Sequence, residues 1–528
     1  ILRNTEPELH LRSVTLTAKD KICLCETREC TPEACPYANG YYARIKGALW
    51  DVLDVPCLTA ETLQEYAERH MVCPFELGLD SSLWSDVIIG DYNYLFDPVV
   101  HLVRFFESAG DYIFLVDEAH NLPGRAREMH SAALTKTSFY EAKKLLGKGK
   151  SSLKNALTKV NDVFIEWRHR AEEETAARDG RFGKTFFLKE RSEEFDHLLN
   201  RLCEPLEAWL DDHREPDETH TALLQLYFDV RAWLRVADTF DDHFVLQITA
   251  SGSEVRAAQL CLDPSAFLAD SFALGRAAVL FSATLAPASY YKDLCGVPEA
   301  RAVALRSPFP AGNQGLFCIG NVSTRYKDRD ASLAIVAESL ATMVRARCGN
   351  YLAFFPSYAY MEQAYAQFKE HCPEINCIKQ ENAMDEQQKA AFLAQFVPGP
   401  SQTLLGFAVM GGVFGEGVDL TGDRLIGVGI VGPGLPQVGP RQEQLRDYFE
   451  QTRGSGFDYA YRYPGMNKVL QAAGRVIRTP RDKGVVLLID NRFAMPDYRR
   501  LMPPHWSHLK MIYDTEKLER ELGRFWEE

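Results

Sequence analysis

The sequence predicts an α/β protein built on parallel β-sheets. Several short apolar runs have the pattern of strands buried on both faces, and each ends in a polar motif. The plainest is Tyr112–Val116, which is followed at once by Asp117-Glu118-Ala119-His120. Open α/β sheets bind their ligands at the carboxyl ends of such strands. With 528 residues, the chain has room for three or four domains, each with its own core.

The two carboxylates after Tyr112–Val116 indicate nucleoside triphosphate hydrolysis. In this interpretation Asp117 holds a magnesium ion, directly or through a water, and Glu118 polarises the attacking water. The alternative is a solvated acidic loop after a core strand, which is a common feature of proteins. The buried strand in front of the motif favours the catalytic interpretation.

Composition limits where the chain works and what it binds. Hydrophobic residues make up 46% and charged residues 25%, as in ordinary globular proteins. There is no apolar run of 18 residues and no signal peptide at Ile1–Thr5, so we expect a cytoplasmic protein without a membrane span. The first residue is Ile1, which indicates that the start of the natural protein is missing. The net charge of −14 argues against an overall basic surface, but nucleic acid binding needs only local basic stripes.

Six of the thirteen cysteines lie between residues 23 and 73, although the total is too small for a disulfide scaffold. Four thiolates can hold an iron–sulfur cluster or a zinc ion. The candidate ligands are Cys23, Cys30, Cys35 and Cys73, with Cys25 as a substitute for Cys23 and Cys57 as a spare buried thiol. The uneven spacing suits a cluster better than the two tight pairs typical of zinc ribbons. The alternative is a group of unrelated buried cysteines.

Around the cysteines the sequence predicts short strands and helices. Residues 12–18 and 84–90 are strand-like, a Tyr- and Ala-rich helix follows Cys35, and Glu61–His70 forms a second helix. The aromatic and amide side chains of Asp91–Pro98 either stack on nucleic acid bases or pack at the edge of a core.

From Ala133 to Phe240 the chain is charged and helix-periodic, with no strand signal of weight. Eight Lys or Arg residues against two acids between positions 143 and 170 predict a helical insertion with one basic face; a solvated face is the plain alternative. Two sequences here, Gly149-Lys150-Ser151 and Gly183-Lys184-Thr185, match the end of a phosphate-binding loop. We reject both, because neither has the earlier glycine or follows a buried strand.

Strand patterns return in the second half of the chain. They lie at Val245–Ala250, Arg276–Leu280, Gly349–Ser357, Leu404–Val409, Leu425–Val431 and Gly484–Ile489. A new unit begins after Ser307–Pro310. Ser282 and Thr284 follow a strand, where small hydroxyl residues can relay the state of a γ-phosphate. The glycine-rich loop 411–419 follows another strand and contains Glu416 and Asp419.

The last motif is a predicted helix, Gln471–Arg478. Gln471, Arg475 and Arg478 are spaced i, i+4, i+7, so one helix face would carry all three. Two guanidinium groups and an amide suit a triphosphate, whereas salt bridges to a neighbouring helix are the alternative. Residues 462–510 hold ten Lys or Arg against three Asp, a local charge of +7 that fits a phosphate-rich partner.

Together these motifs resemble the superfamily-two DNA helicases of the XPD and DinG type, which carry an iron–sulfur cluster. The resemblance rests on a four-cysteine segment before the acidic motif and on Val116–Leu122, Ser282–Leu285, Gly415–Asp419 and Gln471–Arg478. Three further stretches look most like the bacterial DinG-like branch: Lys19–Cys23, Cys35–Tyr42 and Asp91–Pro98.

The resemblance implies two RecA-like domains with ATP between them, and an iron–sulfur domain and a helical arch inserted in the first. The implied segments are 1–22, 74–132 and 241–310 for the first RecA-like domain, 23–73 for the cluster, 133–240 for the arch and 311–528 for the second RecA-like domain. It also implies a monomer that moves 5′ to 3′ on single-stranded DNA and acts at single-strand/duplex junctions, in repair or replication.

The resemblance also assigns roles to individual residues. Asp117 and Glu118 match the magnesium-binding and water-activating acids, and His120, Ser282 and Thr284 match groups that couple hydrolysis to the grip on DNA. The loop that touches nucleotide and DNA corresponds to Gly415, Glu416, Gly417 and Asp419, and the arginine-finger helix to Gln471, Arg475 and Arg478. The implied cofactors are ATP, magnesium and a 4Fe–4S cluster.

One part of the family pattern is absent. The family begins with a phosphate-binding loop upstream of the cysteines, and this sequence starts after that point. We therefore expect a fragment of a helicase that by itself hydrolyses ATP poorly or not at all. Two alternatives are a single-strand-binding relative without a motor and a DinG-related nuclease. Intact Glu118, Arg475 and Arg478 argue against the first, and no separate carboxylate cluster supports the second.

Overall fold

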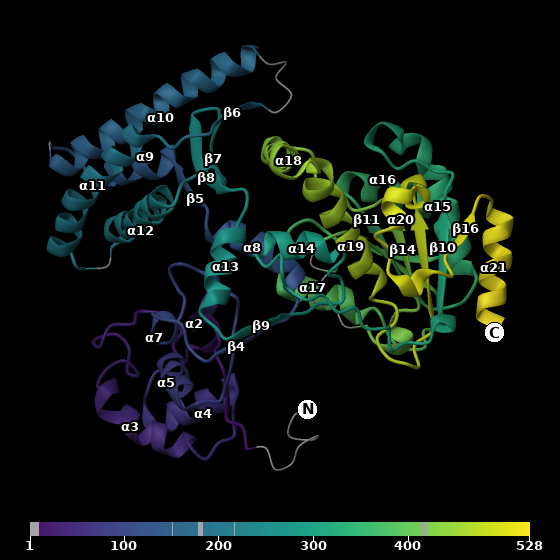
Figure 1. Ribbon diagram of the computed structural model, residues 1–528, viewed down its shortest axis with the longest axis horizontal. Helices are drawn as coiled ribbons and strands as arrows, with labels where there is room; N and C mark the ends of the chain where they lie inside the picture. The colour runs from purple at the N-terminus through teal and green to yellow at the C-terminus, as the bar shows by residue number, and fades with distance from the viewer. Residues whose placement is uncertain are drawn as a thin grey trace. The chain divides into compact units, whose positions relative to one another are not determined.

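The computed structural model describes residues 10–149, 151–177, 183–215, 217–412, 414 and 420–527. The chain forms two compact units, Ile1–Gly110 and Asp111–Glu528, and each is described by itself (Figure 1). Parallel sheets occur in both units, with an additional antiparallel sheet in the second. This is the α/β class that the sequence predicts: two RecA-like domains with insertions.

The first unit contains a small parallel sheet in the order β2-β1-β3, beside several short helices. The strands are β1 (Ser13–Thr15), β2 (Cys57–Leu58) and β3 (Val87–Ile89). The helices are α2 (Lys19–Ile22), α3 (Tyr41–Val52), α4 (Ala60–His70), α5 (Pro74–Ser81), α6 (Asn93–Phe96) and α7 (Val103–Phe106). These elements confirm the predicted strands near residues 12–18 and 84–90 and both predicted helices.

Helix α3 forms because its apolar residues recur with helical spacing. Tyr41, Ile45, Ala48 and Val52 all face the core of this unit. The Tyr41 hydroxyl donates to Asp80 Oδ2 at 2.8 Å, which ties the start of the helix to the end of α5. Phe96, in the stretch that allowed base stacking as one interpretation, is also buried, so at this position the packing interpretation holds.

The second unit is dominated by a seven-stranded parallel sheet in the order β12-β13-β11-β14-β15-β10-β16 (Figure 1). Its strands are β10 (Gln314–Ile319), β11 (Asn350–Phe355), β12 (Asn376–Lys379), β13 (Leu404–Val409), β14 (Gly427–Val431), β15 (Gly484–Ile489) and β16 (Lys510–Ile512). The central strands are buried on both faces and, apart from Asn350 at the start of β11, have no charged or amide side chains, as expected for a parallel sheet covered by helices.

Alternate residues of this sheet pack into two cores. One core joins Leu352 and Phe354 to helices α17 (Glu386–Ala394) and α19 (Tyr463–Ala473). The other joins Tyr351 and Phe355 to three helices, namely α15 (Arg329–Arg345), α16 (Tyr358–His371) and α21 (Thr515–Glu527). The ends of β13 and β15 agree with the sequence prediction, whereas β10, β12 and β16 were not predicted.

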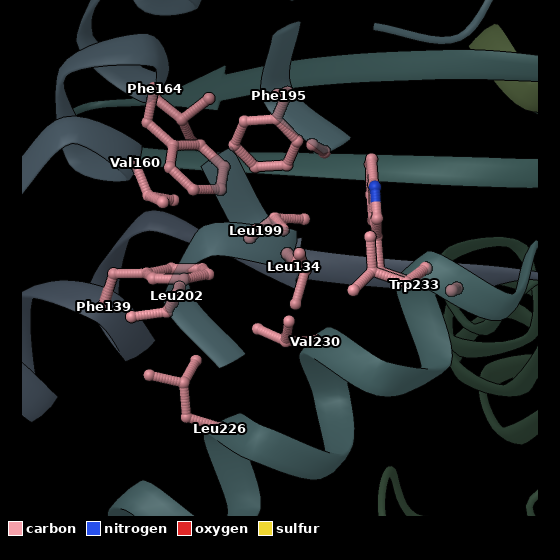
Figure 2. Close-up of a cluster of buried hydrophobic side chains, with 14 of the residues drawn as sticks. Leu134, Phe139, Val160, Phe164, Phe195, Leu199, Leu202, Leu226, Val230 and Trp233 are labelled. Carbon is pink, nitrogen blue, oxygen red and sulfur yellow. The ribbon is translucent and has the colours of Figure 1, made fainter. Parts of the chain in front are cut away.

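A helical segment with its own antiparallel sheet lies, along the chain, between strands β4 (Ile113–Val116) and β9 (Ala277–Leu280). Its helices are α9 (Lys136–Leu145), α10 (Ser152–Ala177), α11 (Glu193–Asp212) and α12 (Glu218–Asp238). The sheet has the order β5-β8-β7-β6, formed by β5 (Ala132–Thr135), β6 (Lys184–Leu188), β7 (Phe244–Ser251) and β8 (Glu254–Cys261). Figure 2 shows the shared core, where Phe164, Phe195 and Trp233 lie among aliphatic side chains.

The expectation that residues 133–240 contain no strand is therefore wrong. Strand β6 has only five residues, and its one fully buried position is Phe186, so its apolar signal is short. The strand is held by antiparallel pairing with β7, more than 50 residues later, which no local pattern reveals. Lys184 and Thr185 open this strand, which supports the rejection of a phosphate-binding loop there.

The strand before the acidic motif is also less buried than predicted. Strands β4 (Ile113–Val116) and β9 (Ala277–Leu280) form a two-stranded parallel ladder. Ile113 and Leu115 are 63% and 69% exposed, and only Val116 is fully buried. A ladder of two strands gives each strand one neighbour within this unit, so apolar side chains that a wider sheet would cover lie at its surface.

Candidate active site

The acidic motif begins where β4 ends. Asp117 and Glu118 follow Val116, and the short 3₁₀ helix Ala119–Asn121 comes next. Asp117 Oδ1 accepts a hydrogen bond of 2.7 Å from the Glu118 backbone N–H. The Glu118 backbone has φ = 45°, a left-handed conformation that costs a non-glycine residue on the order of 1–3 kcal/mol. The backbone turns sharply here, and the Glu118 side chain remains 61% exposed.

His120 connects this motif to the second motif, after β9. His120 Nδ1 lies 2.7 Å from Ser282 Oγ, and Ser282 Oγ donates to Glu118 Oε2 at 3.2 Å. Thr284 completes the turn, because its backbone N–H donates to Ser282 Oγ at 3.2 Å. The His120 side chain is almost fully buried, so its ring orientation is fixed by these contacts. The structure therefore brings His120, Ser282 and Thr284 together beside Glu118.

Gln471 contacts the other side of the same imidazole. Gln471 Nε2 on α19 lies 2.5 Å from His120 Nε2, and the two residues are 351 positions apart in the sequence. With the amide nitrogen as the donor, His120 Nε2 accepts and the ring proton resides on Nδ1, facing Ser282. A continuous chain of hydrogen bonds then runs from Gln471 through His120 and Ser282 to the Glu118 carboxylate.

The predicted helix Gln471–Arg478 is shorter in the structure, because α19 ends at Ala473. Arg475 follows in a turn and Arg478 in a stretch without regular structure, so the three residues do not share one helix face. The Asp482 carboxylate holds this following stretch, because it accepts hydrogen bonds of 2.7 Å from the backbone N–H groups of Arg478 and Thr479. A side chain that binds these groups competes with continued helix formation. Arg478 is exposed and Arg475 is half-buried.

The glycine-rich loop residues Gly415, Glu416, Gly417 and Asp419 lie outside the described residues.

The basic stretch 462–510 is partly neutralised within the protein. Arg462 pairs with Asp458 and Asp497, Arg500 pairs with Asp458, and Arg492 pairs with Asp490. Asp490 and Asp497 are already subtracted in the local charge of +7, whereas Asp458 lies outside the stretch and reduces the charge that is open to a phosphate-rich partner further.

Two of the candidate thiols, those of Cys25 and Cys35, lie close together in the first unit. Cys25 Sγ lies 3.8 Å from Cys35 Sγ, and Cys73 is the residue that precedes α5. Partial burial lowers the pKa of Lys19, but the nearby thiols of Cys30 and Cys73 outweigh this effect and its pKa is raised overall. Among the described residues no three His, Cys, Asp or Glu side chains form a site for a single metal ion. Cys57 is exposed on β2, so the expectation of a buried thiol there is wrong.

A buried carboxylate at the carboxyl edge of the large sheet was not predicted. Asp490 directly follows β15 and accepts hydrogen bonds from Thr324 and from the Arg492 guanidinium, at 2.5 to 2.9 Å. Burial raises the pKa of Asp490, but the hydrogen bonds and the charge of Arg492 prevail, so its pKa lies below the usual value. The sequence signal was an Asp immediately after a buried strand, the same signal that identified Asp117.

We expect Asp490→Asn to lower the free energy of unfolding by about 1.5–3 kcal/mol, because hydrogen bonds to a charged group are lost. A carboxylate whose folded pKa is depressed stabilises the protein above its unfolded pKa and loses this effect as the pH falls through the folded pKa. Urea unfolding should thus show a higher free energy of unfolding for the wild type than for Asp490→Asn at neutral pH, and this difference should decrease below about pH 4. Asp330→Asn, at an exposed position of α15, is the matched control. A gap of constant size at all pH values would contradict this account.

A second unpredicted cluster holds α18 (Pro440–Arg453) against elements that lie 160 or more residues earlier in the chain. Arg453 donates to Asp263 Oδ2 at 3.2 Å and to Asp293 Oδ2 at 2.8 Å. Asp263 follows β8 and its side chain is fully buried, while Asp293 lies on α14 (Ala288–Leu294). The hydrogen bond to Asp293 raises the pKa of Arg453. These pairs span 160 or more residues, so no local pattern in the sequence could have indicated them.

Comparison with known proteins agrees with this geometry. The DEAD_2 family model matches residues 8–139, and a model of the helicase C-terminal domain matches residues 340–509, so together they cover more than half of the chain. The first match contains the cysteines and the acidic motif, and the second contains Gln471 and both arginines. The chain belongs to the XPD/DinG-type superfamily-two DNA helicases.

The curated proteins and solved structures that are similar to this chain include helicases of the same family. The helicase subunit XPD of the general transcription and DNA repair factor IIH of Schizosaccharomyces pombe is 24% identical over 84% of this chain and 67% of its own length. The ATP-dependent DNA helicase CHL1 of Coccidioides immitis is 22% identical over 86% of this chain and 60% of its own. A solved XPD helicase structure matches 96% of this chain, and is itself covered to 87%, with a TM-score of 0.60 and 18% identity.

The chain spans only part of these helicases. It covers 46% of the regulator of telomere elongation helicase 1 of Rattus norvegicus, which is 22% identical over 96% of this chain. The structural likeness, at under 25% identity, shows the shared fold. In the part of the chain that the structure describes, no helix is both long and apolar enough to cross a membrane.

Proposed function

We propose that this chain is the core of an ATP-dependent helicase that moves 5′ to 3′ on single-stranded DNA and separates duplexes at junctions, in repair or replication. The observation that carries the proposal is the hydrogen-bonded chain from Gln471 through His120 and Ser282 to Glu118. It connects the acid that would activate water to the helix next to the two arginines. The names of the similar proteins, which are helicases, support the same activity.

In this mechanism, the carboxyl end of β4 is the site for ATP. Asp117 would hold a magnesium ion, which would supply charge to the phosphates, and Glu118 would accept a proton from the attacking water. Ser282 and His120 orient the Glu118 carboxylate through the contacts described above. Arg475 and Arg478 stabilise the charge that develops on the transferred phosphoryl group. Because Gln471 contacts His120, a movement of His120 during ATP hydrolysis would displace α19 as well.

We also propose the domain organisation of the family, with one adjustment. The first RecA-like domain comprises 1–22, 74–132 and 262–310, and the cluster domain comprises 23–73. The second RecA-like domain comprises 311–528. Strands β7 and β8 share a core with the four helices of the arch, which supports an arch domain of residues 133–261 in place of 133–240.

The proposal is tested by ATPase and strand-displacement assays on this chain and on a version extended at its N-terminus through the phosphate-binding loop that the family implies. We expect only the extended protein to hydrolyse ATP, with stimulation by single-stranded DNA, and to open duplexes with a 5′ overhang.

Gln471→Ala should reduce the DNA-stimulated rate more than the basal rate, because it breaks the contact with His120. Gln451→Ala, at an exposed position of α18, is the control. If both versions bind single strands and neither hydrolyses ATP, a binding module without a motor is the correct reading; cleavage of the strand would indicate a nuclease.

A 4Fe–4S cluster in the first unit is a further part of the proposal. Cys30, Cys35, Cys73 and one of Cys23 or Cys25 would hold it, and the bound cluster would stabilise the local fold. The short distance from Cys25 to Cys35 favours Cys25 as the ligand. Wild type and variants should therefore be compared by iron content and visible absorption of the purified protein. We expect Cys25→Ser to lose most of its iron and Cys23→Ser to keep it; Cys57→Ser is the control. The reverse pattern would make Cys23 the ligand.

A further inference from the structure

Helix α3 presents two aromatic rings on its outer face. Tyr42 is 89% exposed and Trp50 is 75% exposed, although both belong to a helix whose opposite face is buried in the core. Lys46 lies between them and is exposed as well. Most large aromatic side chains of a folded protein gain stability by burial, so two highly exposed rings on one helix indicate a surface that binds something.

The spacing places these three side chains in one row. Positions 42, 46 and 50 follow i, i+4, i+8, so at 3.6 residues per turn they lie within roughly 80° of arc, with Lys46 in the middle. The rise of about 1.5 Å per residue separates the two rings by about 12 Å along the helix. That distance is more than three times the rise of about 3.4 Å between stacked bases. Each ring can therefore contact a different base of one strand, with Lys46 near a phosphate between them.

The charges around the row fit a polyanion. From Tyr37 to Trp50 the sequence contains Arg44 and Lys46 and no acid, although the whole chain has a net charge of −14. Asp51 is the nearest acid, and its carboxylate is already held by His70 Nε2 at 2.9 Å. Arg44 donates to the backbone carbonyls of Pro36 and Met71, so it supports the fold while Lys46 faces outward.

A protein partner fits this face less well. The exposed residues beside the row, Ala43 and Gly47, supply little apolar area, and Lys is depleted in the centres of protein interfaces. Aromatic rings alternating with a cation are instead typical of surfaces that bind single-stranded nucleic acid, where bases stack on rings and phosphates pair with Lys or Arg.

We propose that the outer face of α3 is a stacking platform for single-stranded DNA, on which Tyr42 and Trp50 each stack on a base and Lys46 binds an intervening phosphate. This inference rests on the proposed function and adds a strand-contact site in the cysteine-bearing unit. Stacking on unpaired bases holds the strand without reading its sequence, because every base has a π-face. The platform thus retains single strands of any sequence and does not bind duplex, whose bases are already stacked.

The test measures binding of a labelled oligothymidylate to the full-length protein by fluorescence anisotropy. We expect Tyr42→Ala and Trp50→Ala each to weaken binding roughly 5- to 100-fold, and Trp50→Phe to restore most of the loss. Lys46→Ala should weaken binding and lower the slope of log affinity against log salt by about one. Trp84→Ala removes an exposed tryptophan elsewhere in the same unit and should bind as wild type does.

Oligonucleotides with abasic sites distinguish stacking from a structural role of the rings. Removing bases keeps the phosphates, so it should weaken binding to the wild type and have little further effect on the double variant Tyr42→Ala/Trp50→Ala. Wild-type binding by this double variant would overturn the proposal, and so would an equal abasic penalty in both proteins. In either of these cases the wild type still binds single strands and the proposed helicase stands. A wild type that fails to bind single-stranded DNA at all would overturn the helicase proposal itself.

Discussion

Replacement of Glu118 by Gln is expected to lower the DNA-stimulated ATPase rate by about 10²–10⁴-fold, the usual contribution of a positioned general base. The amide is nearly isosteric, so it can still accept a hydrogen bond from Ser282 Oγ, and the fold should be unchanged. What it cannot do is take a proton from water. We therefore expect nucleotide affinity to stay close to that of the wild type while kcat falls.

The measurement is steady-state ATP hydrolysis by the N-terminally extended protein, with nucleotide binding measured separately. Glu128→Gln is the control, because Glu128 is an exposed acid on the helix after the motif, α8 (Leu122–Met129). A Glu118→Gln protein that retains more than a tenth of the wild-type rate would remove Glu118 from the role of general base. Asp117 would then be the acid to examine next.

The second large effect is expected in the core of the arch. Phe195 is fully buried and contacts the rings of Phe164, Trp167 and Trp233 at centroid distances of 4.6 to 5.4 Å. Phe195→Ala removes this ring from a packed aromatic cluster, and such changes cost about 3–5 kcal/mol because a cavity remains. We expect the arch to unfold at a clearly lower urea concentration, while the large parallel sheet keeps its own transition.

Tryptophan fluorescence reports this transition, since Trp167 and Trp233 lie in the same cluster. Phe228→Ala is the control, because Phe228 lies on α12 and is 56% exposed; its loss should change stability little. Ile248→Ala, on β7, tests whether that strand belongs to the arch. If Ile248→Ala left the transition of the arch unchanged, the core shared by the helices and β7 would not be a cooperative unit.

The sequence was a good guide to most of the long, buried strands of the parallel sheet, although it missed β10, which has six residues. Leu404–Val409 and Gly484–Ile489 were predicted to the residue, because strands covered by helices on both faces need continuous apolar runs. Strands β6 and β12 are short and depend on pairing with distant strands, so their local signal was too weak. Long-range pairing, and not local preference, determines such elements.

The residues of the candidate site likewise divide into those that the sequence indicated and those that it did not. Asp117, Glu118, His120 and Ser282 could be found because each follows a strand, and the carboxyl ends of parallel strands converge. The end of α19 could not, because the Asp482 carboxylate that holds the following turn lies outside the repeating pattern of the helix. The contact of Gln471 with His120 crosses 351 residues, and nothing in the sequence pointed to it.

The backbone at Glu118 has an evolutionary consequence. Glycine adopts a φ of 45° without steric strain, whereas a residue with a side chain, such as this glutamate, lowers the stability of the fold at this position. Under the proposed function, selection would keep this glutamate, in spite of that cost, for the chemistry of its side chain. In a lineage that kept this fold but no longer hydrolysed ATP, mutation would be free to replace the glutamate by glycine or asparagine. The identity of this one residue can therefore serve, across a set of related genomes, to separate lineages with a working motor from those that have lost it.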